Sequence, residues 1–259
     1  MTAPERITAR DNPLLVRLRK LSRDPGGYRR TGELWLEGEH LCQALVNRQG
    51  RPAIALLTDA AWARPGLHTL ASLASRTVLL PETLFAGLSS LESPAAIGFV
   101  WRSPTPPSIL PDVPTVVLDR LQDAGNVGSI LRSAAALGVR QVLALHGTAA
   151  LWSPKVLRAG MGAHFGLRLV ELLDLADLDV LTVPLLGTSS HSAQRLHACT
   201  LPQPCAWVLG HEGQGVQPEL LARCAQVLGI AQPGGEESLN VAAAAAVCLH
   251  EALRQRLGQ

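Results

Sequence analysis

Short apolar runs recur through the C-terminal half of the chain, and segments with helical spacing separate most of them. Runs of about four to eight apolar or β-branched residues bounded by turn residues are typical of buried strands. Their alternation with helices predicts an α/β fold with a largely parallel sheet. The expected strands are residues 115–121, 141–146, 181–188, 206–210 and 226–231.

The N-terminal part of the chain carries a second, smaller α/β pattern. Apolar residues at helical spacing predict a basic helix over residues 13–21, and the proline and glycines of residues 24–32 predict a flexible loop after it. Further on, the pattern predicts strands at 34–37, 53–58, 77–81 and 95–101, a helix at 39–47 and a weak helix at 81–88.

A proline-rich segment separates the two patterns. Proline has no backbone N–H and a fixed φ, so this density favours an extended spacer. The predicted organisation is a first domain over residues 1–101, a linker over 102–114 and a second domain over 115–259, which ends in an alanine-rich helix over 238–256. The prolines are Pro104, Pro106, Pro107, Pro111 and Pro114.

Basic residues are concentrated near the N-terminus, although the whole chain is nearly neutral. The composition is 47% hydrophobic and 17% charged, which is that of a globular protein, and the formal net charge is only +2. The basic cluster is either a solvated helix face or a contact for nucleic-acid phosphates, and the sequence leaves both open. It consists of Arg6, Arg10, Arg17, Arg19, Lys20, Arg23, Arg29 and Arg30.

The cysteines form no Cys-x-x-Cys pair and lie mostly among apolar neighbours, which predicts reduced thiols in the core. No signal peptide opens the chain, and no uninterrupted apolar run reaches about 18 residues. The expected location is the cytoplasm, without membrane insertion. The five cysteines are Cys42, Cys199, Cys205, Cys224 and Cys248.

Three glycine-bearing turns follow predicted strands of the second domain, at residues 123–129, 210–215 and 232–240. Glycine lets a backbone approach a ligand closely, and the carboxyl ends of parallel strands meet at one edge of a sheet. The three turns therefore predict one shared pocket.

Several common types of site are not supported. The Gly-x-Gly-x-x-Gly fingerprint is absent, and the segment from Gly210 to Gly215 is followed by Val216 where a P-loop has lysine, which argues against an NAD enzyme and a P-loop ATPase. No Gly-x-Ser-x-Gly elbow supports a serine hydrolase. The scattered histidines and the cysteine spacing predict no metal site.

Individual side chains in the turns have both structural and functional interpretations. Asn126 is a candidate helix N-cap. It lies near the N-terminal end of the helix, with Arg132 on a neighbouring face, and this helix end together with the guanidinium favours the binding of a phosphate. Glu212, between glycines, is a turn residue or a carboxylate close to a ligand. Ser238 is a candidate N-cap of the last helix, and Asn240 lies two residues further on.

Together the three turns resemble the signature motifs of the SpoU family of RNA ribose 2'-O-methyltransferases, of the SPOUT class. The motifs are LDRLQDAGNVGSILRSAAALGV, WVLGHEGQGV and IAQPGGEESLNVAAAAAV, in the family's order and separation. The resemblance covers residues 114–256. The segments ITARDNPLLVRLRKL and ELWLEGEHLCQAL look like the family's RNA-binding extension, a ribosomal L30e-like α/β domain.

The resemblance implies methyl transfer from S-adenosylmethionine to a ribose 2'-hydroxyl in structured RNA, ribosomal rather than transfer RNA. It further implies a deep C-terminal trefoil knot and a homodimer formed through the C-terminal domain. The implied catalytic residues are Asn126, Arg132, Glu212, Ser238 and Asn240. The implied cofactor contacts are Gly187, Leu209, Gly210, Glu212, Gly213, Ile230, Ser238 and Leu239.

Two positions depart from the family pattern. His211 stands where the second motif commonly has Asn, and Gly160 where members often have Ser, with Arg158 beside it as a second candidate for an RNA phosphate. Three alternatives remain open: a transfer-RNA methyltransferase, a catalytically silent RNA-binding protein of the same fold, and methylation of a small molecule or protein.

Overall fold

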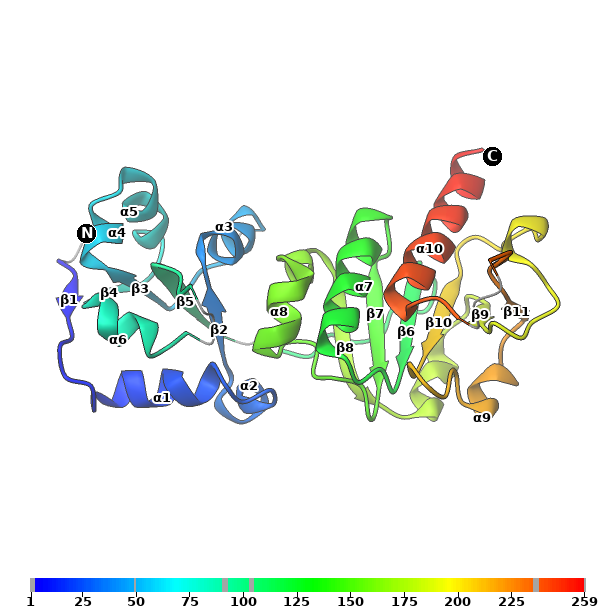
Figure 1. The fold of residues 1–259 in the computed structure, drawn as a ribbon, viewed down its shortest axis with the longest axis horizontal. Coiled ribbons are helices and arrows are strands. Elements are labelled where there is room, and N and C mark those ends of the chain that lie inside the picture. The colour runs from blue at the N-terminus through cyan, green and yellow to red at the C-terminus, as the bar shows by residue number, and fades with distance from the viewer. Residues whose placement is uncertain (1–2, 49, 90–92, 103–104, 235–237, 259) are drawn as a thin grey trace. The chain divides into compact units, whose positions relative to one another are not determined.

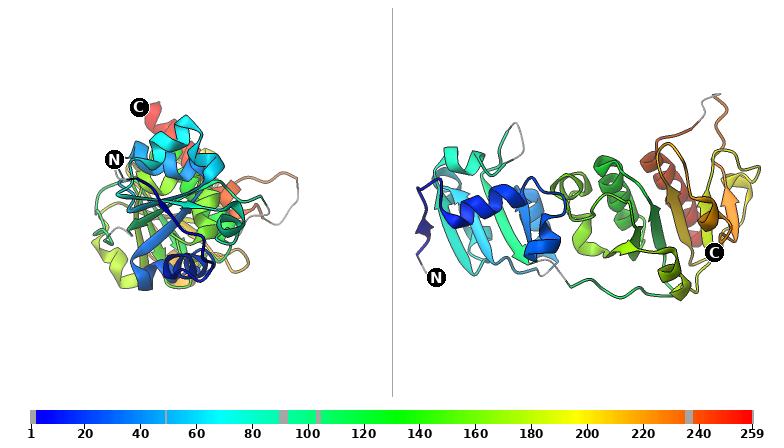
Figure 2. Two further views of the ribbon diagram at one scale, coloured as in Figure 1. Left: turned by 90° about the vertical axis from the view of Figure 1, so that its left-hand side faces the viewer. Right: turned by 90° about the horizontal axis from the view of Figure 1, so that it is seen from below.

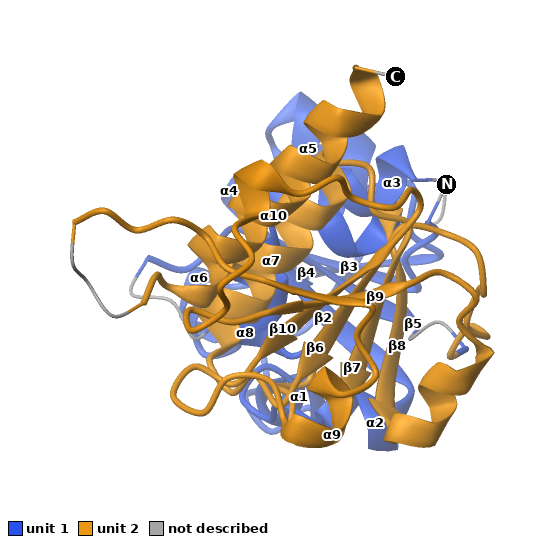
Figure 3. Cartoon of the chain, turned by 90° about the vertical axis from the view of Figure 1, so that its right-hand side faces the viewer, with its two compact units in different colours: residues 1–105, 152–165 blue, residues 106–151, 166–259 orange. Residues whose placement is uncertain are grey.

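A computed structural model describes residues 3–48, 50–89, 93–102, 105–234 and 238–258. Pro104 of the predicted linker and residues 235–237 of the third turn lie outside these ranges. The chain forms two compact units, which Figure 3 shows in different colours: Met1–Thr105 with Trp152–Phe165, and Pro106–Leu151 with Gly166–Gln259. The first unit thus includes a segment from beyond the predicted linker.

The first unit is built on a mixed sheet with the strand order β1-β4-β3-β5-β2 (Figure 1). β1, β4 and β3 run parallel, whereas β5 is antiparallel to both β3 and β2. The predicted strands of this half are confirmed to within three residues, but β1 was not predicted. The strands are β1 (Glu5–Arg6), β2 (Glu33–Glu37), β3 (Ile54–Thr58), β4 (Arg76–Leu80) and β5 (Ile97–Arg102).

The helices of the first unit include the predicted basic helix. In α1 (Pro13–Leu21), the apolar residues Leu14, Leu15, Leu18 and Leu21 are buried, and the Asn12 side chain caps the N-terminus by accepting from Leu14 N. The flexible loop predicted after it is wrong in part, because residues of this segment form the short helix α2 (Gly27–Thr31). The other helices are α3 (Glu39–Asn47), α4 (Asp59–Trp62), α5 (Pro65–Ala71), α6 (Glu82–Ala86), α8 (Pro154–Gly160) and η1 (Ala163–Gly166).

The second unit contains a sheet with the strand order β11-β9-β10-β6-β7-β8, and every strand pair described in it is parallel. The predicted parallel α/β arrangement is therefore confirmed. β9 is shorter than predicted because Pro184 lies inside the predicted run. The strands are β6 (Thr115–Asp119), β7 (Gln141–Leu145), β8 (Arg168–Leu173), β9 (Leu185–Thr188), β10 (Ala206–Gly210) and β11 (Gln226–Leu228).

Both faces of this sheet are covered, as a parallel sheet requires. α7 (Ala124–Ala136) and α10 (Val241–Leu257) lie side by side on one face (Figures 1 and 2). Trp207 and Leu249 line a narrow gap under α10. On the other face Val117 and Val208 pack into a cluster with residues of η2 (Leu175–Val180) and α9 (Pro218–Leu221). η3 (Leu196–Ala198) contacts α10.

β8 was not predicted, and it forms one edge of the sheet. Leu143 pairs with Val170 and Leu145 with Leu173, so two residues of β8 lie opposite one residue of β7. One of the two is Leu172, whose φ is 60° and whose side chain is 49% exposed. This geometry is that of a β-bulge.

The cysteines are all free thiols, as predicted. Cys42, Cys205 and Cys248 are buried, and burial raises the pKa of Cys205 and Cys248 to about 12. Within the described ranges, no helix combines the length and the apolar character needed to cross a membrane.

Candidate active site

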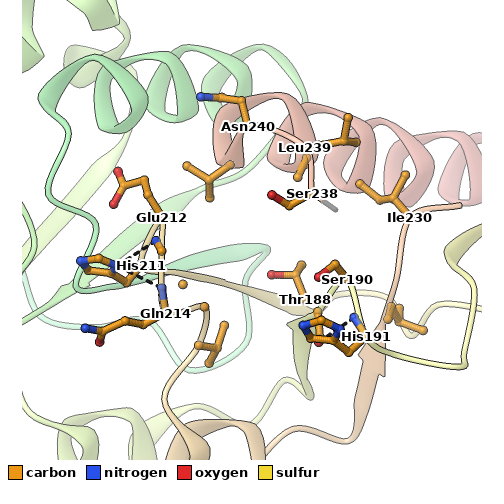
Figure 4. Close-up of a pocket in the computed structure, with 18 of the residues that line it drawn as sticks. Thr188, Ser190, His191, His211, Glu212, Gln214, Ile230, Ser238, Leu239 and Asn240 are labelled. Atoms are coloured by element: carbon orange, nitrogen blue, oxygen red, sulfur yellow. Dashed lines mark hydrogen bonds between the residues drawn. The ribbon is translucent and has the colours of Figure 1, made fainter. Parts of the chain in front are cut away.

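A cavity of about 910 Å³ lies where β9, β10 and β11 end and α10 begins. Figure 4 shows side chains from these segments pointing into it. The second and third glycine-bearing turns line the cavity, as predicted. Residues 123–129 do not line it, so that part of the prediction is wrong, and the first turn reaches the site only through hydrogen bonds of Asp123 and Asn126 to Glu212. The lining residues are Thr188, Ser189, Ser190, His191, Gly210, His211, Glu212, Gly213, Gln214, Gly215, Val216, Leu221, Leu228, Ile230, Gln232, Ser238, Leu239, Asn240, Val241 and Ala244.

One wall of the cavity is the tight loop that follows β10, residues 211–215. His211 and Gly215 exchange both backbone hydrogen bonds, at 3.0 and 2.8 Å, and Gly215 has a φ of +68°. Gly210 lies against the returning chain so closely that an added Cβ would be 2.1 Å from Val216 N. Only glycine fits this position, and the loop depends on it.

The Glu212 carboxylate is held by three donors from the start of α7. Oε2 accepts from Gln122 N at 3.2 Å, and Oε1 accepts from Asp123 N and from Asn126 Nδ2, both at 3.1 Å. Burial by itself raises the pKa of Glu212. The hydrogen bond from Asn126, followed by those from the backbone N–H groups of Glu212 itself, Gln122 and Asp123, outweighs this effect, so the pKa is lowered. The bonded carboxylate therefore stabilises the fold at neutral pH, and this contribution is lost when acid takes the pH through the lowered value.

Asn126 and Asn240 continue this network between the two helices. Asn240 Nδ2 donates to Asn126 Oδ1 at 2.9 Å, while Asn240 Oδ1 accepts from Ala242 N and Ala243 N. Asn240, not Ser238, is thus the N-cap of α10, which corrects that prediction. The cap alternative for Asn126 is also wrong, because Asp123 caps α7 by accepting from Asn126 N at 2.7 Å.

A second network, not predicted from the sequence, supports the other side of the loop. Asp119 is fully buried at the end of β6 and accepts from Gln217 N, Gln217 Nε2 and Arg120 Nε at 2.7, 2.9 and 2.9 Å. Arg120 Nη1 donates to Gln214 Oε1 at 3.1 Å, and the bond to Asp119 raises the pKa of Arg120. A carboxylate at the end of an apolar run was the signal that could have indicated it.

The other implied residues lie outside the cavity lining. Arg132 is exposed on α7, and its side chain has no hydrogen-bond or ion-pair partner among the described residues. Gly187 and Leu209 lie within β9 and β10, with Leu209 buried, and their cofactor contacts stay predictions. Arg158 and Gly160 lie in α8, which belongs to the first unit.

The two functions of Asn240 can be separated by substitution. Asn240→Ala should lower the free energy of unfolding by about 1 kcal/mol, because two N–H groups of α10 lose their acceptor. Asn240→Asp keeps the acceptor and removes only the donor to Asn126, so its stability should stay within about 0.5 kcal/mol of the wild type. Urea unfolding measures both. Equal losses in the two variants would contradict the assigned cap.

The protein family model of the SpoU rRNA methylases matches residues 114–250, more than half of the chain and the whole set of segments that form the cavity. The chain belongs to the SpoU rRNA methylase family. Its parallel α/β architecture also matches that of solved SpoU methyltransferases. Within the described ranges, no group of three or more His, Cys, Asp or Glu side chains is placed so that it could hold a metal ion.

SpoU relatives extend over nearly the whole chain. An uncharacterised tRNA/rRNA methyltransferase of Synechocystis is 33% identical over 96% of this chain and 94% of its own length. The 23S rRNA (guanosine(2553)-2'-O)-methyltransferase RlmP of Bacillus subtilis is 29% identical over 85% of this chain and 88% of its own length. The SpoU methyltransferase AviRb of Streptomyces viridochromogenes, solved in complex with AdoMet, superposes with a TM-score of 0.85 at 24% identity, covering 95% of this chain and 98% of that one.

Proposed function

We propose that the protein transfers a methyl group from S-adenosylmethionine to a ribose 2'-hydroxyl of ribosomal RNA. The observation that carries the proposal is the hydrogen-bonded chain from Glu212 through Asn126 to Asn240 at the cavity. These three residues come from the three motifs of the family. Family membership and the names of its relatives, a 23S rRNA ribose methyltransferase among them, support this reaction and favour ribosomal over transfer RNA.

The cavity has the size and chemistry that S-adenosylmethionine needs. A volume of about 910 Å³ lies in the range of small-molecule sites, which reach about 1,000 Å³. Ile230, Leu239 and Val216 provide apolar surface for the adenine ring, and Gly210 lines the cavity without a side chain. The complex of a related SpoU methyltransferase with AdoMet supports this assignment. When bound, the cofactor supplies a methyl group on a positively charged sulfur.

The implied catalytic residues have distinct tasks in this reaction. The 2'-oxygen would form a bond to the methyl carbon, the sulfur would keep the electron pair of the broken carbon–sulfur bond as a neutral thioether, and the hydroxyl proton would pass to solvent water. Arg132 cannot take that proton, because a guanidinium stays protonated in proteins. Instead it binds an RNA phosphate beside the 2'-hydroxyl and stabilises the developing negative charge on the oxygen. Asn126 and Glu212 hold the ribose in line, and Ser238 and Asn240 complete the site.

A direct test combines a chemical and a cellular measurement. Ribosomal RNA from cells with and without the gene should differ by one or more 2'-O-methyl groups, which mass spectrometry of RNA fragments maps. The purified protein should restore that group with S-adenosylmethionine. Loss of the gene without any change in ribosomal RNA, but with a change in transfer RNA, would favour the transfer-RNA alternative. Calorimetry without cofactor binding would favour the silent RNA-binding protein.

The basic cluster of the first unit supports RNA as the partner. A groove of about 790 Å³ between α1 and α2 is lined by five cationic side chains and one carboxylate, that of Asp24, which pairs with Arg30. The side chains of Lys20 and Arg23 have no ion-pair or hydrogen-bond partner in the part of the chain that the structure describes. Unpaired cations around a groove attract RNA phosphates. The cations are Arg17, Arg19, Lys20, Arg23 and Arg30.

Removal of the unpaired cations should weaken RNA binding. In Lys20→Ala/Arg23→Ala the affinity for ribosomal RNA should fall by about tenfold, and the slope of log affinity against log salt should decrease by about 2. Filter binding over a range of salt concentrations measures both quantities. Arg48→Ala/Arg51→Ala removes the same charge from exposed positions outside the groove and is the matched control. Equal effects of the two pairs would contradict a specific role of the groove.

Four further features belong to the same proposal. Residues 1–101 form an L30e-like RNA-binding domain, residues 102–114 a linker, and residues 115–259 the methyltransferase domain with a deep trefoil knot. The protein works as a cytoplasmic homodimer joined through the second domain. The family motifs support the knot and the dimer, and the exposed apolar side chains Val247 and Leu257 on α10 offer surface for a second copy.

A further inference from the structure

The loop at residues 211–215 contains an unusual arrangement around an imidazole. His211 Nδ1 accepts hydrogen bonds from two successive backbone N–H groups, those of Gly213 at 3.0 Å and Gln214 at 3.2 Å (Figure 4). Together with the backbone pairing between His211 and Gly215, these bonds close the loop from inside. The loop is itself a wall of the cavity, so the ring determines the shape of that wall.

This contact requires one protonation state of the ring. A neutral imidazole has one nitrogen that accepts and one that donates, whereas a protonated ring has two donors. Because His211 Nδ1 accepts from Gly213 and Gln214, the proton of the neutral ring is on Nε2. A protonated ring would place an N–H against two N–H groups. The closed loop and the charged ring are therefore incompatible.

We propose that His211 is the positioning residue of the cofactor loop: its neutral ring holds residues 211–215 in the shape that binds S-adenosylmethionine, and protonation of the ring releases them. The proposal rests on the proposed function. Asn, which is common at this position in the family, carries Oδ1 on Cγ as His carries Nδ1, so it reaches the same two N–H groups. Asn does not take up a proton in this pH range, so the acid sensitivity of these two hydrogen bonds depends on the imidazole.

The other titratable groups near the loop include His191, which lines the same cavity. On the loop, Glu212 accepts from residues at the start of α7, where Asp123 caps the helix. At the end of β6, Asp119 is bonded to Gln217 and Arg120, and the only charged side chain of α9, Glu219, is exposed. His211→Asn leaves all of these groups in place. A difference in pH dependence between the wild type and this variant therefore reports on the imidazole.

The experiment uses the full chain and two readouts. Calorimetric titration with S-adenosylmethionine at about pH 8 and about pH 5.5 brackets the range in which histidine side chains titrate. Hydrogen–deuterium exchange of the segment around Gly213 and Gln214, corrected for the intrinsic exchange rate and measured without cofactor, reports on loop closure directly. The variants are His211→Asn, His211→Ala and, as a control on an exposed histidine outside the cavity lining, His197→Asn.

At about pH 8, His211→Asn should bind the cofactor within about threefold of the wild type, and His211→Ala about tenfold more weakly, with faster exchange at residues 213 and 214. In acid, the wild type and His197→Asn should weaken toward His211→Ala, while His211→Asn should not. Wild-type affinity and exchange in His211→Ala, or equal weakening of His211→Asn in acid, would overturn the role of His211 alone. No cofactor binding by the wild type at about pH 8 would overturn the proposed function as well.

Discussion

Arg132→Ala is expected to slow methyl transfer by about 10²–10³-fold under single-turnover conditions, with cofactor and RNA both saturating. In the proposed mechanism the Arg132 guanidinium stabilises the developing charge on the 2'-oxygen, and water would replace it poorly. Folding should be unchanged, because Arg132 is exposed and its side chain has no polar partner among the described residues. The affinity for S-adenosylmethionine should also stay within about threefold, since Arg132 does not line the cavity.

Two companion variants sharpen this test. Arg132→Lys keeps the charge but loses the planar fork that binds a phosphate through two bonds, so its rate should lie between those of the wild type and Arg132→Ala. Arg140→Ala removes an exposed cation of the same unit and should leave the rate unchanged within about twofold. Wild-type single-turnover methylation by Arg132→Ala would show that Arg132 has no part in the chemical step.

Gly210→Ala should remove cofactor binding and lower the free energy of unfolding by about 1–3 kcal/mol. The added Cβ would lie 2.1 Å from Val216 N and 2.2 Å from Gly215 C, and these are backbone atoms that cannot rotate away. The loop must open to relieve the contact, and it then loses the pairing of His211 with Gly215. Calorimetric titration measures the binding, and urea unfolding measures the stability.

Gly213→Ala is the matched control for stability. An added Cβ there meets only the His211 ring, at 3.8 Å, which is an ordinary contact. Its free energy of unfolding should therefore stay within about 0.5 kcal/mol of the wild type. A Gly210→Ala protein that binds S-adenosylmethionine with wild-type affinity would contradict the close packing derived for this loop.

Local patterns in the sequence predicted much of the fold. The helix at α1 and the strands β6, β7 and β10 carry uninterrupted apolar or periodic signals that need no knowledge of distant residues. The pattern failed at β8 and at α2. The alternation in β8 is broken by Glu171 and by the bulge at Leu172, and α2 begins among glycines that normally end a helix.

The site was predicted in its members but not in its contacts. Family motifs indicated Asn126, Glu212 and Asn240, yet nothing local shows that one amide bridges a carboxylate 86 residues away and a helix cap 114 residues away. The hydrogen bonds that Gln217 donates to Asp119 likewise join residues far apart in the sequence, with a separation of 98 residues. Side-chain partners are set by the packing of the sheet, so they follow from the fold and not from spacing along the chain.

The bulge at Leu172 has a consequence for how the protein behaves at high concentration. An edge strand such as β8 presents unpaired N–H and C=O groups that can recruit a strand of another molecule, which is a route to aggregation. The extra residue interrupts the regular spacing of these groups and increases the local twist, so an incoming strand finds no continuous ladder. Deletion of Leu172 is expected to straighten β8 and to let this edge strand pair with a strand of another molecule.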